Sequence, residues 1–213
     1  MGETKASHGS LKDELDSITA LPSLSSITHD LRVLLETYGY VGVILIDLES
    51  LNEIEAECGH GVYNQLLAAV AEEVGRIRHT IMRAGDVVCS VRPFGEQIVI
   101  FLEGSRWSSE LTPEALEAAV DRLWISLAPR IADMTRAYGS QGRCRLGYSL
   151  VLPNPMIQPE RLIYRAIDQA RQMADDHFRR LQARGREMLR DLIVRGRLGA
   201  VFQPMLQLGD GSV

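Results

Sequence analysis

A short polar hinge between two apolar runs is the first place where side chains of this sequence could do chemistry. In the stretch VRPFGEQIVIFLEG, residues 91–104, an acid and an amide stand side by side at Glu96 and Gln97. A carboxylate at a bend can bind a cation or transfer a proton, whereas a neutral amide is poorer at both. The hinge of Phe94, Gly95, Glu96 and Gln97 is therefore an active site, the remains of one, or a turn.

Two other kinds of reactive side chain give no pattern of a site. Cys58, Cys89 and Cys144 are odd in number and widely spaced, without the CxxC pairs of zinc or redox sites. We expect them to be small buried side chains in a reducing cytoplasm. His60 has no second histidine near it in a ligand pattern, so we expect it to serve a helix turn. No metal site is assigned to these groups.

The composition is that of an ordinary soluble globular protein. Of the 213 residues, 46% are hydrophobic and 24% are charged, and the net charge is −5. The arginines over residues 179–197 alternate with acids and apolar residues, which indicates a solvated helix face rather than a nucleic-acid surface. No window approaches the ~20 apolar residues of a membrane span, and no signal segment is present. We expect a cytoplasmic protein, with neither nucleic acid nor membrane as partner.

The elements that must position these side chains follow from the apolar pattern. Apolar residues at helical spacing predict a helix over residues 24–39 that ends near a glycine. The apolar, β-branched run over residues 40–50 is typical of a strand that is buried on both faces. A short helix over residues 51–58 and a longer one over residues 62–81 should follow.

The second half of the chain alternates strands and helices. Two strand patterns with almost nothing between them predict a hairpin, and a proline at position 113 marks the start of a long helix. The expected elements are strands over residues 86–93 and 97–103, a helix over 114–139, a strand over 144–153 and a helix over 158–183. This order predicts an α+β domain with an antiparallel component.

The last residues change in character. Residues 186–213 predict a helix, a glycine-containing turn and a strand, AVFQPMLQL, that stops at a Gly-Asp-Gly turn. A strand that ends where its hairpin partner should begin is typical of a second domain that has been cut short. We therefore expect the chain to be a fragment of a longer protein.

Five segments, in order, resemble motifs of the GGDEF domain, the diguanylate cyclase module that joins two GTP molecules into cyclic di-GMP. They are DSITALPS, VILIDLESLNEIEAECGHG, RAGD, RPFGEQIVIFL and ERLIYRAIDQARQMA. They are similar to the family's entry motif, its first strand with a metal-binding Asp and Gly-His turn, the R-x-x-D of its inhibitory product site, its R-x-G-G-D-E-F signature and its late helix. The resemblance covers residues 16–180. It implies an α/β (α+β) fold of the GGDEF or nucleotidyl-cyclase type, a ferredoxin-like palm with a central, mostly antiparallel sheet flanked by helices.

The resemblance assigns metal-site roles to four positions. Asp47 corresponds to the family's first metal ligand and remains an acid, although a helix N-cap or a strand-end turn residue would also be an Asp. Glu96 falls on the third signature position and remains an acid. Gln97 replaces a metal-binding Glu and weakens any site for a hard divalent ion. Phe94 replaces the first signature glycine and would fill the space that admits the nucleotide. Two-metal binding should therefore fail.

The nucleotide contacts of the family are replaced as well. Glu55 stands where the resemblance implies a guanine-binding Asn, and Asn64 where it implies an Asp. Exchanged donors and acceptors leave hydrogen bonds unmade. Asn52 and Ala174 replace the two phosphate-binding lysines, so a triphosphate loses its compensating charge. Cyclase activity is not expected from these residues.

Arg83 and Asp86 match the R-x-x-D of the family's inhibitory site, where such a pair binds a cyclic di-GMP dimer. An Arg is suited to planar recognition of guanine. The spacing from Asp86 to the signature is two residues longer than usual, which preserves the alternation of faces in a strand. An exposed turn is the competing interpretation.

The tail from residue 189 resembles the start of an EAL domain, the cyclic di-GMP phosphodiesterase module. We therefore expect an N-terminal extension or signalling helix over residues 1–15, a degenerate GGDEF domain over 16–182, and a linker helix with the start of an EAL domain over 183–213. The expected function is regulatory, through a protein partner or self-association in bacterial cyclic di-GMP signalling. Two alternatives stay open: a module that senses GTP or cyclic di-GMP, and a residual cyclase. No cofactor is expected, except Mg²⁺ if a nucleotide still binds.

Overall fold

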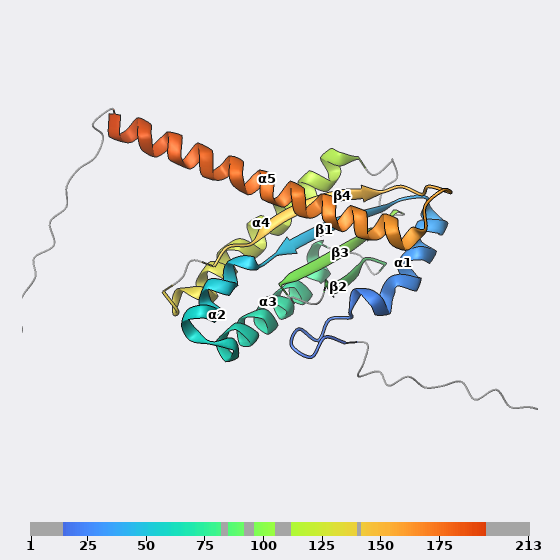
Figure 1. The fold of residues 1–213 in the computed structure, drawn as a ribbon, viewed down its shortest axis with the longest axis horizontal. Helices are drawn as coiled ribbons and strands as arrows, with labels where there is room; N and C mark the ends of the chain where they lie inside the picture. The colour runs from blue at the N-terminus through green and yellow to red at the C-terminus, as the bar shows by residue number, and fades with distance from the viewer. Residues whose placement is uncertain (1–14, 82–84, 92–95, 105–111, 140–141, 195–213) are drawn as a thin grey trace, which may run out of the picture. The chain divides into compact units, whose positions relative to one another are not determined.

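The computed structural model describes residues 15–81, 85–91, 96–104, 112–139 and 142–194 (Figure 1). The chain divides into two compact units, Met1–His177 and Phe178–Val213. The expectations for residues 1–14 and for the tail strand lie outside the described residues. The domain boundaries after residues 15 and 182 stay predictions.

A four-stranded antiparallel sheet in the order β2-β3-β1-β4 forms the centre of the first unit. All seven residues of β1 are buried, which confirms the prediction of a strand covered on both faces. β2 and β3 pair as the expected hairpin, and the α+β fold with a mostly antiparallel sheet is confirmed. The strands are β1 Val41–Asp47, β2 Val87–Val91, β3 Gln97–Glu103 and β4 Arg145–Val151.

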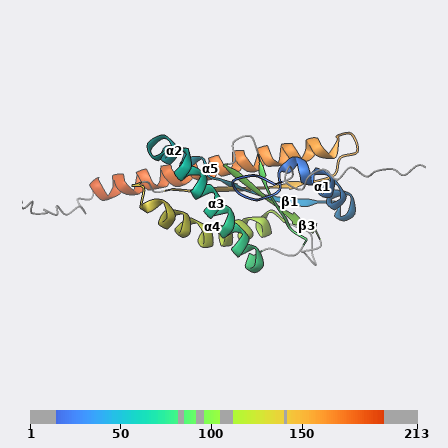
Figure 2. The same ribbon diagram turned by 90° about the horizontal axis from the view of Figure 1, so that it is seen from below.

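Helices cover both faces of this sheet, because successive residues of its central strands are apolar and point alternately to the two faces. Ile44 and Ile46 of β1 pack into a core with α3 and α4, whereas Val43 and Leu45 pack into a second core with α1 and α5 (Figure 2). The helices are α1 Leu24–Tyr38, α2 Asn52–Cys58, α3 His60–Ile81, α4 Pro113–Arg136 and α5 Pro159–Val194, with a 3₁₀ turn η1 at Glu49–Leu51.

The packing of α5 on β4 is unusually close. A Cβ atom on Gly147 would lie 1.9 Å from the carbonyl oxygen of Ala170 in α5. Two residues along the strand, the hydroxyl of Ser149 donates a 2.7 Å hydrogen bond to the carbonyl oxygen of Ala166. Every second residue of β4 therefore faces α5, and the first residue in this row is Arg145.

A single helix, α5, replaces the two helices predicted over residues 158–183 and 186–194. Gly185, which lies between the two predicted helices, adopts no left-handed conformation and continues the helix. In the second unit, the described residues are the helical Phe178–Val194. Their arginines are exposed, which confirms the solvated face for these residues, and so are four large apolar side chains, Met188, Leu189, Ile193 and Val194.

The prediction of buried cysteines is confirmed for two of three. Cys89 and Cys144 are buried, and this burial raises the pKa of each thiol to about 12. Cys58 is exposed, because the last residue of α2 points away from the core. Within the described residues, no helix is long and apolar enough to cross a membrane.

Candidate functional site

Three side chains meet in one row at the end of the sheet. Asp47 is the last residue of β1, and the register of the strands places it opposite Gln97 of β3 and opposite Arg145 of β4. Residues that are directly paired in antiparallel strands present their side chains on the same face. That face is the one covered by α5, since Asp47 lies two residues after Leu45. The sheet thus brings an acid, an amide and a guanidinium together beneath α5.

The carboxylate of Asp47 is satisfied by the chain itself. Its side chain is only 6% exposed. Oδ1 accepts a 2.8 Å hydrogen bond from the backbone N–H of Glu49, and Oδ2 accepts a 3.2 Å bond from Nε2 of Gln97. Asp47 therefore serves as the strand-end turn residue that the sequence left open as an alternative to a metal ligand.

Gln97 links this acid to α5. Its Oε1 accepts a 2.7 Å hydrogen bond from Nη2 of Arg171, while its Nε2 donates to Asp47. The orientation of the amide follows from its neighbours, because a guanidinium can only donate and a carboxylate can only accept. Arg171 also donates a 2.6 Å bond to Asp168 on the same helix. The position at which the resemblance implies a metal-binding oxygen thus presents an N–H₂ group to the metal-site acid.

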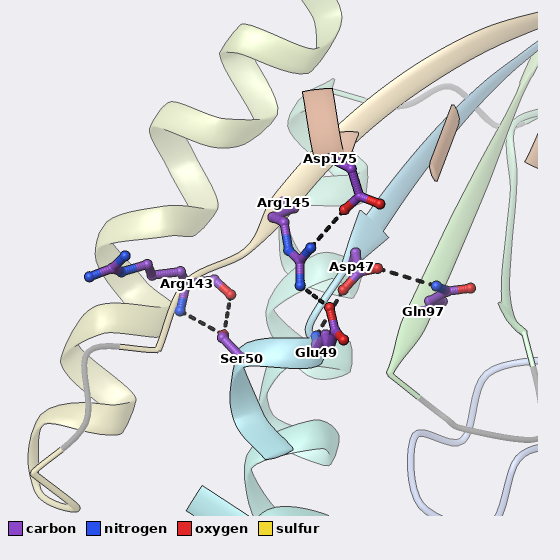
Figure 3. A network of polar contacts seen from close by, with 7 residues as sticks. All are labelled: Asp47, Glu49, Ser50, Gln97, Arg143, Arg145 and Asp175. Atoms are coloured by element: carbon purple, nitrogen blue, oxygen red, sulfur yellow. Dashed lines mark hydrogen bonds and ion pairs between the residues drawn. The ribbon is translucent and has the colours of Figure 1, made fainter. Parts of the chain in front are cut away.

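Arg145 lies among acids from different elements (Figure 3). Its guanidinium donates to Oδ1 of Asp175 in α5 at 2.7 Å and to the carboxylate of Glu49 in η1. Burial lowers the pKa of Arg145, but attraction to Asp47, Glu49 and Asp175 outweighs it and leaves the pKa above its usual range. We call Asp47, Glu49, Gln97, Arg145 and Asp175 the Arg145 cluster.

These residues do not fit the divalent metal that the resemblance implies. Mg²⁺ takes oxygen ligands at ~2.1 Å in octahedral geometry, and the amide of Gln97 turns its N–H₂ group, not an oxygen, towards Oδ2 of Asp47. Across the described residues, no group of three or more His, Cys, Asp or Glu side chains is placed to hold a metal ion. The positive charge in this place is the guanidinium of Arg145.

The guanine side of the expected site contains a residue that the sequence reasoning did not consider. Tyr63 directly precedes Asn64, is 6% exposed, and hydrogen-bonds the side chain of Glu96. Burial is the main cause that raises the pKa of Tyr63, and the charges of Glu96 and Glu55 raise it further. A buried phenol therefore stands beside the acid retained at the third signature position.

The remaining predicted positions are placed as follows. Asn52 begins α2, and its Oδ1 is buried without a hydrogen-bond partner in the described part of the chain. Ala174 lies on the buried face of α5, is 2% exposed and offers no charge. Asp86 is 1% exposed, and its Oδ1 accepts a 3.0 Å hydrogen bond from the N–H of Glu103. Arg83, Phe94 and Gly95 lie outside the described residues, so the inhibitory-type site stays a prediction.

Sequence reasoning missed Arg145 because it belongs to no motif, and Arg171 because its position in the late-helix segment carried no assigned role. One signal could have found the first of them. An arginine opens a strand that is otherwise apolar, at the end where β1 finishes in an acid. A buried strand rarely carries a charge without a partner.

Comparisons with known proteins agree with this fold. Residues 13–180 match the sequence model of the family described as diguanylate cyclase, GGDEF domain. No curated protein sequence matches the chain. The coiled coil and GGDEF domain of DgcB from Caulobacter crescentus, in complex with c-di-GMP, superposes with a TM-score of 0.53 at 11% identity, covering 73% of this chain and 77% of that one.

Two structures from Pseudomonas aeruginosa are similar to the same extent. The GGDEF domain of FimX has a TM-score of 0.53 at 16% identity, covering 76% of this chain and 94% of its own. Diguanylate cyclase SiaD, in complex with its activator SiaC, has a TM-score of 0.51 at 14% identity, covering 79% and 60%. At such identities these structures show the fold alone.

The fold defines a class: an α+β domain with a four-stranded antiparallel sheet between two layers of helices. The match to the family model covers most of the chain. The chain belongs to the GGDEF domain family.

Proposed function

We propose that this chain is a catalytically silent GGDEF domain with a regulatory or protein-interaction role in bacterial cyclic di-GMP signalling. One observation carries the proposal. Both oxygens of Asp47 accept hydrogen bonds from the chain, and one donor is the amide of Gln97, where the resemblance implies a second metal-binding carboxylate. At this position the site offers Asp47 an N–H₂ donor in place of the second oxygen ligand that a divalent ion would need.

Loss of the metal is sufficient to stop this chemistry. Joining two GTP molecules requires a 3′-hydroxyl to attack an α-phosphate, and divalent cations stabilise the charge that develops there. Tyr63 adds a second obstacle, since its buried ring lies beside Glu96 on the guanine side. Ala174 adds a third, because it brings no charge to a triphosphate. Three independent requirements of the reaction are thus unmet.

Gln97 and Arg145, which occupy the place of the metal site, also connect the end of the sheet to α5. Gln97 bonds Arg171, and Arg145 bonds Asp175, so a force on α5 reaches the end of β1 directly. We infer that a protein partner, a second copy of the chain or an attached domain acts through these elements rather than through nucleotide chemistry. The complex of SiaD with its activator SiaC is a precedent for a protein partner on this fold. An attached EAL domain, active or not, is part of the same proposal.

A turnover assay tests the proposal. The purified chain should convert no detectable GTP to cyclic di-GMP with Mg²⁺ or Mn²⁺, while an active GGDEF cyclase assayed in parallel does so. Steady product formation by the chain would contradict the proposal.

Calorimetric titration with GTP and with cyclic di-GMP tests the ligand-sensing alternative. Binding of cyclic di-GMP at micromolar strength that is lost in Arg83→Ala, but kept in Arg143→Ala, would favour a sensing role. The control is an exposed arginine at a distant position in the sequence. Absence of binding for both nucleotides would leave protein contacts as the means of regulation.

A further inference from the structure

We propose that the guanidinium of Arg145 is the resident cation of this site, in the place where the family holds a divalent metal ion, and that it fastens the ends of β1 and β4 to α5. The inference rests on the silent site of the proposed function. It is tested by metal binding and melting temperature, whereas the proposed function is tested by turnover. Either proposal can therefore fail while the other is supported.

The first argument is the convergence of negative charge. Asp47 from β1, Glu49 from η1 and Asp175 from α5 surround one arginine (Figure 3). The side chain of Arg145 is 20% exposed, and its two terminal nitrogens pair with different carboxylates, Nη1 with Asp175 and Nη2 with Glu49. Without this group, three carboxylates from three elements would face one another in a partly buried place. Such an arrangement requires a cation, and repulsion would otherwise separate the elements.

The second argument is position. The strand register puts Arg145 directly opposite Asp47, so the guanidinium lies next to the acid that corresponds to the family's metal ligand. A planar guanidinium has five donors and can bridge carboxylates from separate elements, which a divalent ion does with its coordination shell. Arg143 provides a contrast, because its side chain is exposed and points away from the cluster, while only its backbone bonds Ser50 (Figure 3).

The third argument is exclusion. The carboxylates of Glu49 and Asp175 are engaged by Arg145, and that of Asp47 by the backbone and by Gln97. A divalent ion bound to these carboxylates would lie beside the guanidinium, and two cations in one small site would repel each other. Restoring the family's acid by Gln97→Glu alone should therefore not restore metal binding. Metal binding should also require the replacement of Arg145 by an uncharged residue.

The test begins with melting temperature. Arg145→Ala and the bulkier Arg145→Gln should melt on the order of 5 °C below the unaltered chain, whereas Arg143→Ala should melt within about 1 °C of it. Guanidinium chloride at about 20 mM, compared with equal NaCl, should raise the melting temperature of Arg145→Ala by about 1 °C or more, since the ion refills the vacated place. The unaltered chain and Arg143→Ala should show no such rise.

Metal binding gives an independent readout. In Mn²⁺ titrations followed by electron paramagnetic resonance, the unaltered chain and Gln97→Glu should hold no tightly bound ion. The double variant Gln97→Glu/Arg145→Ala should hold about one equivalent, because four carboxylates then face the site without a guanidinium. Tight Mn²⁺ binding by the unaltered chain would overturn the proposal even if the Arg145 variants failed to fold. So would equal melting temperatures for Arg145→Gln and Arg143→Ala.

Discussion

A single methyl group at Gly147 should destabilise the domain more than most core substitutions. The glycine lies on β4 beneath α5, and the Cβ of an alanine there would lie 1.9 Å from the carbonyl oxygen of Ala170 and 2.7 Å from the backbone nitrogen of Ala174. Both neighbours are backbone atoms of one helix, so no side chain can rotate to make room. The helix itself must move.

The size of this effect follows from the overlap. To regain an ordinary contact of ~3.4 Å, α5 would have to move away from β4 by roughly 1.5 Å. Such a movement loosens the core on that face and lengthens the bond from Arg145 to Asp175, which is 2.7 Å in the native structure. We expect Gly147→Ala to lower the free energy of unfolding by about 3 kcal/mol. For a domain of this size, the melting temperature should fall by about 6–12 °C.

Urea unfolding followed by circular dichroism measures this change, and the same substitution elsewhere is its control. Gly75 lies inside α3, and a Cβ there would have no neighbour within 4 Å. Gly75→Ala should therefore stabilise the chain by about 0.5–1 kcal/mol, because alanine favours a helix. A fall in the free energy of unfolding for Gly147→Ala and a rise for Gly75→Ala would support the close contact between β4 and α5. Unfolding curves for Gly147→Ala that match those of the unaltered chain would refute it.

Three further predictions concern buried polar groups. Glu73→Gln should cost about 2–3 kcal/mol in urea unfolding, since this acid is 2% exposed and pairs with arginines of α3 and α4, while the exposed Glu72→Gln should cost under about 0.5 kcal/mol. Tyr63→Phe should lower the free energy of unfolding by about 1 kcal/mol, because it removes a buried hydrogen bond, and an unchanged value would contradict that contact. Alkaline pH should destabilise the fold: burial raises the thiol pKa values of Cys89 and Cys144 from 9.0 to about 12, so their stabilising effect is complete below pH 9 and is lost as the pH rises towards 12. Each thiol should contribute a fall of about 1.4 kcal/mol per pH unit in that window, and replacing both by alanine should flatten the slope measured in urea.

The sheet could be predicted from the sequence because its signals are local. A continuous apolar run indicated β1, and two short runs across a hinge indicated the β2–β3 hairpin. Burial on both faces then fixes the register, since a slip of one residue would exchange the two cores. The single long α5 could not be predicted in this way. A glycine such as Gly185 can end a helix or continue it, and only the surrounding structure decides.

The residues of the candidate site also fall into two groups, those with a local sequence signal and those without one. Asp47, Glu96 and Gln97 could be found from the sequence, because they lie on or beside a recognisable motif. Arg145 and Arg171 are 98 and 74 residues away from the acid and the amide that they complete, and only strand pairing and helix packing bring them together. Tyr63 could not be found for another reason. The motif comparison concerned the hydrogen-bonding type of Asn64, whereas the effect of Tyr63 comes from the volume of its buried ring.

The exchanges at the end of β1 are coupled by charge. Asp47 is 6% exposed, and a carboxylate in such a place is costly unless it is paired. A glutamine at position 97 removes one negative charge and donates a hydrogen bond, and Arg145 supplies the positive charge that Glu49 and Asp175 require. Either exchange alone would leave the charges unbalanced: an amide without the arginine leaves three acids together, and the arginine beside a fourth acid would face four negative charges with one positive charge. In the proposed silent site the chain supplies its own cation, and the same residues connect the end of β1 to α5.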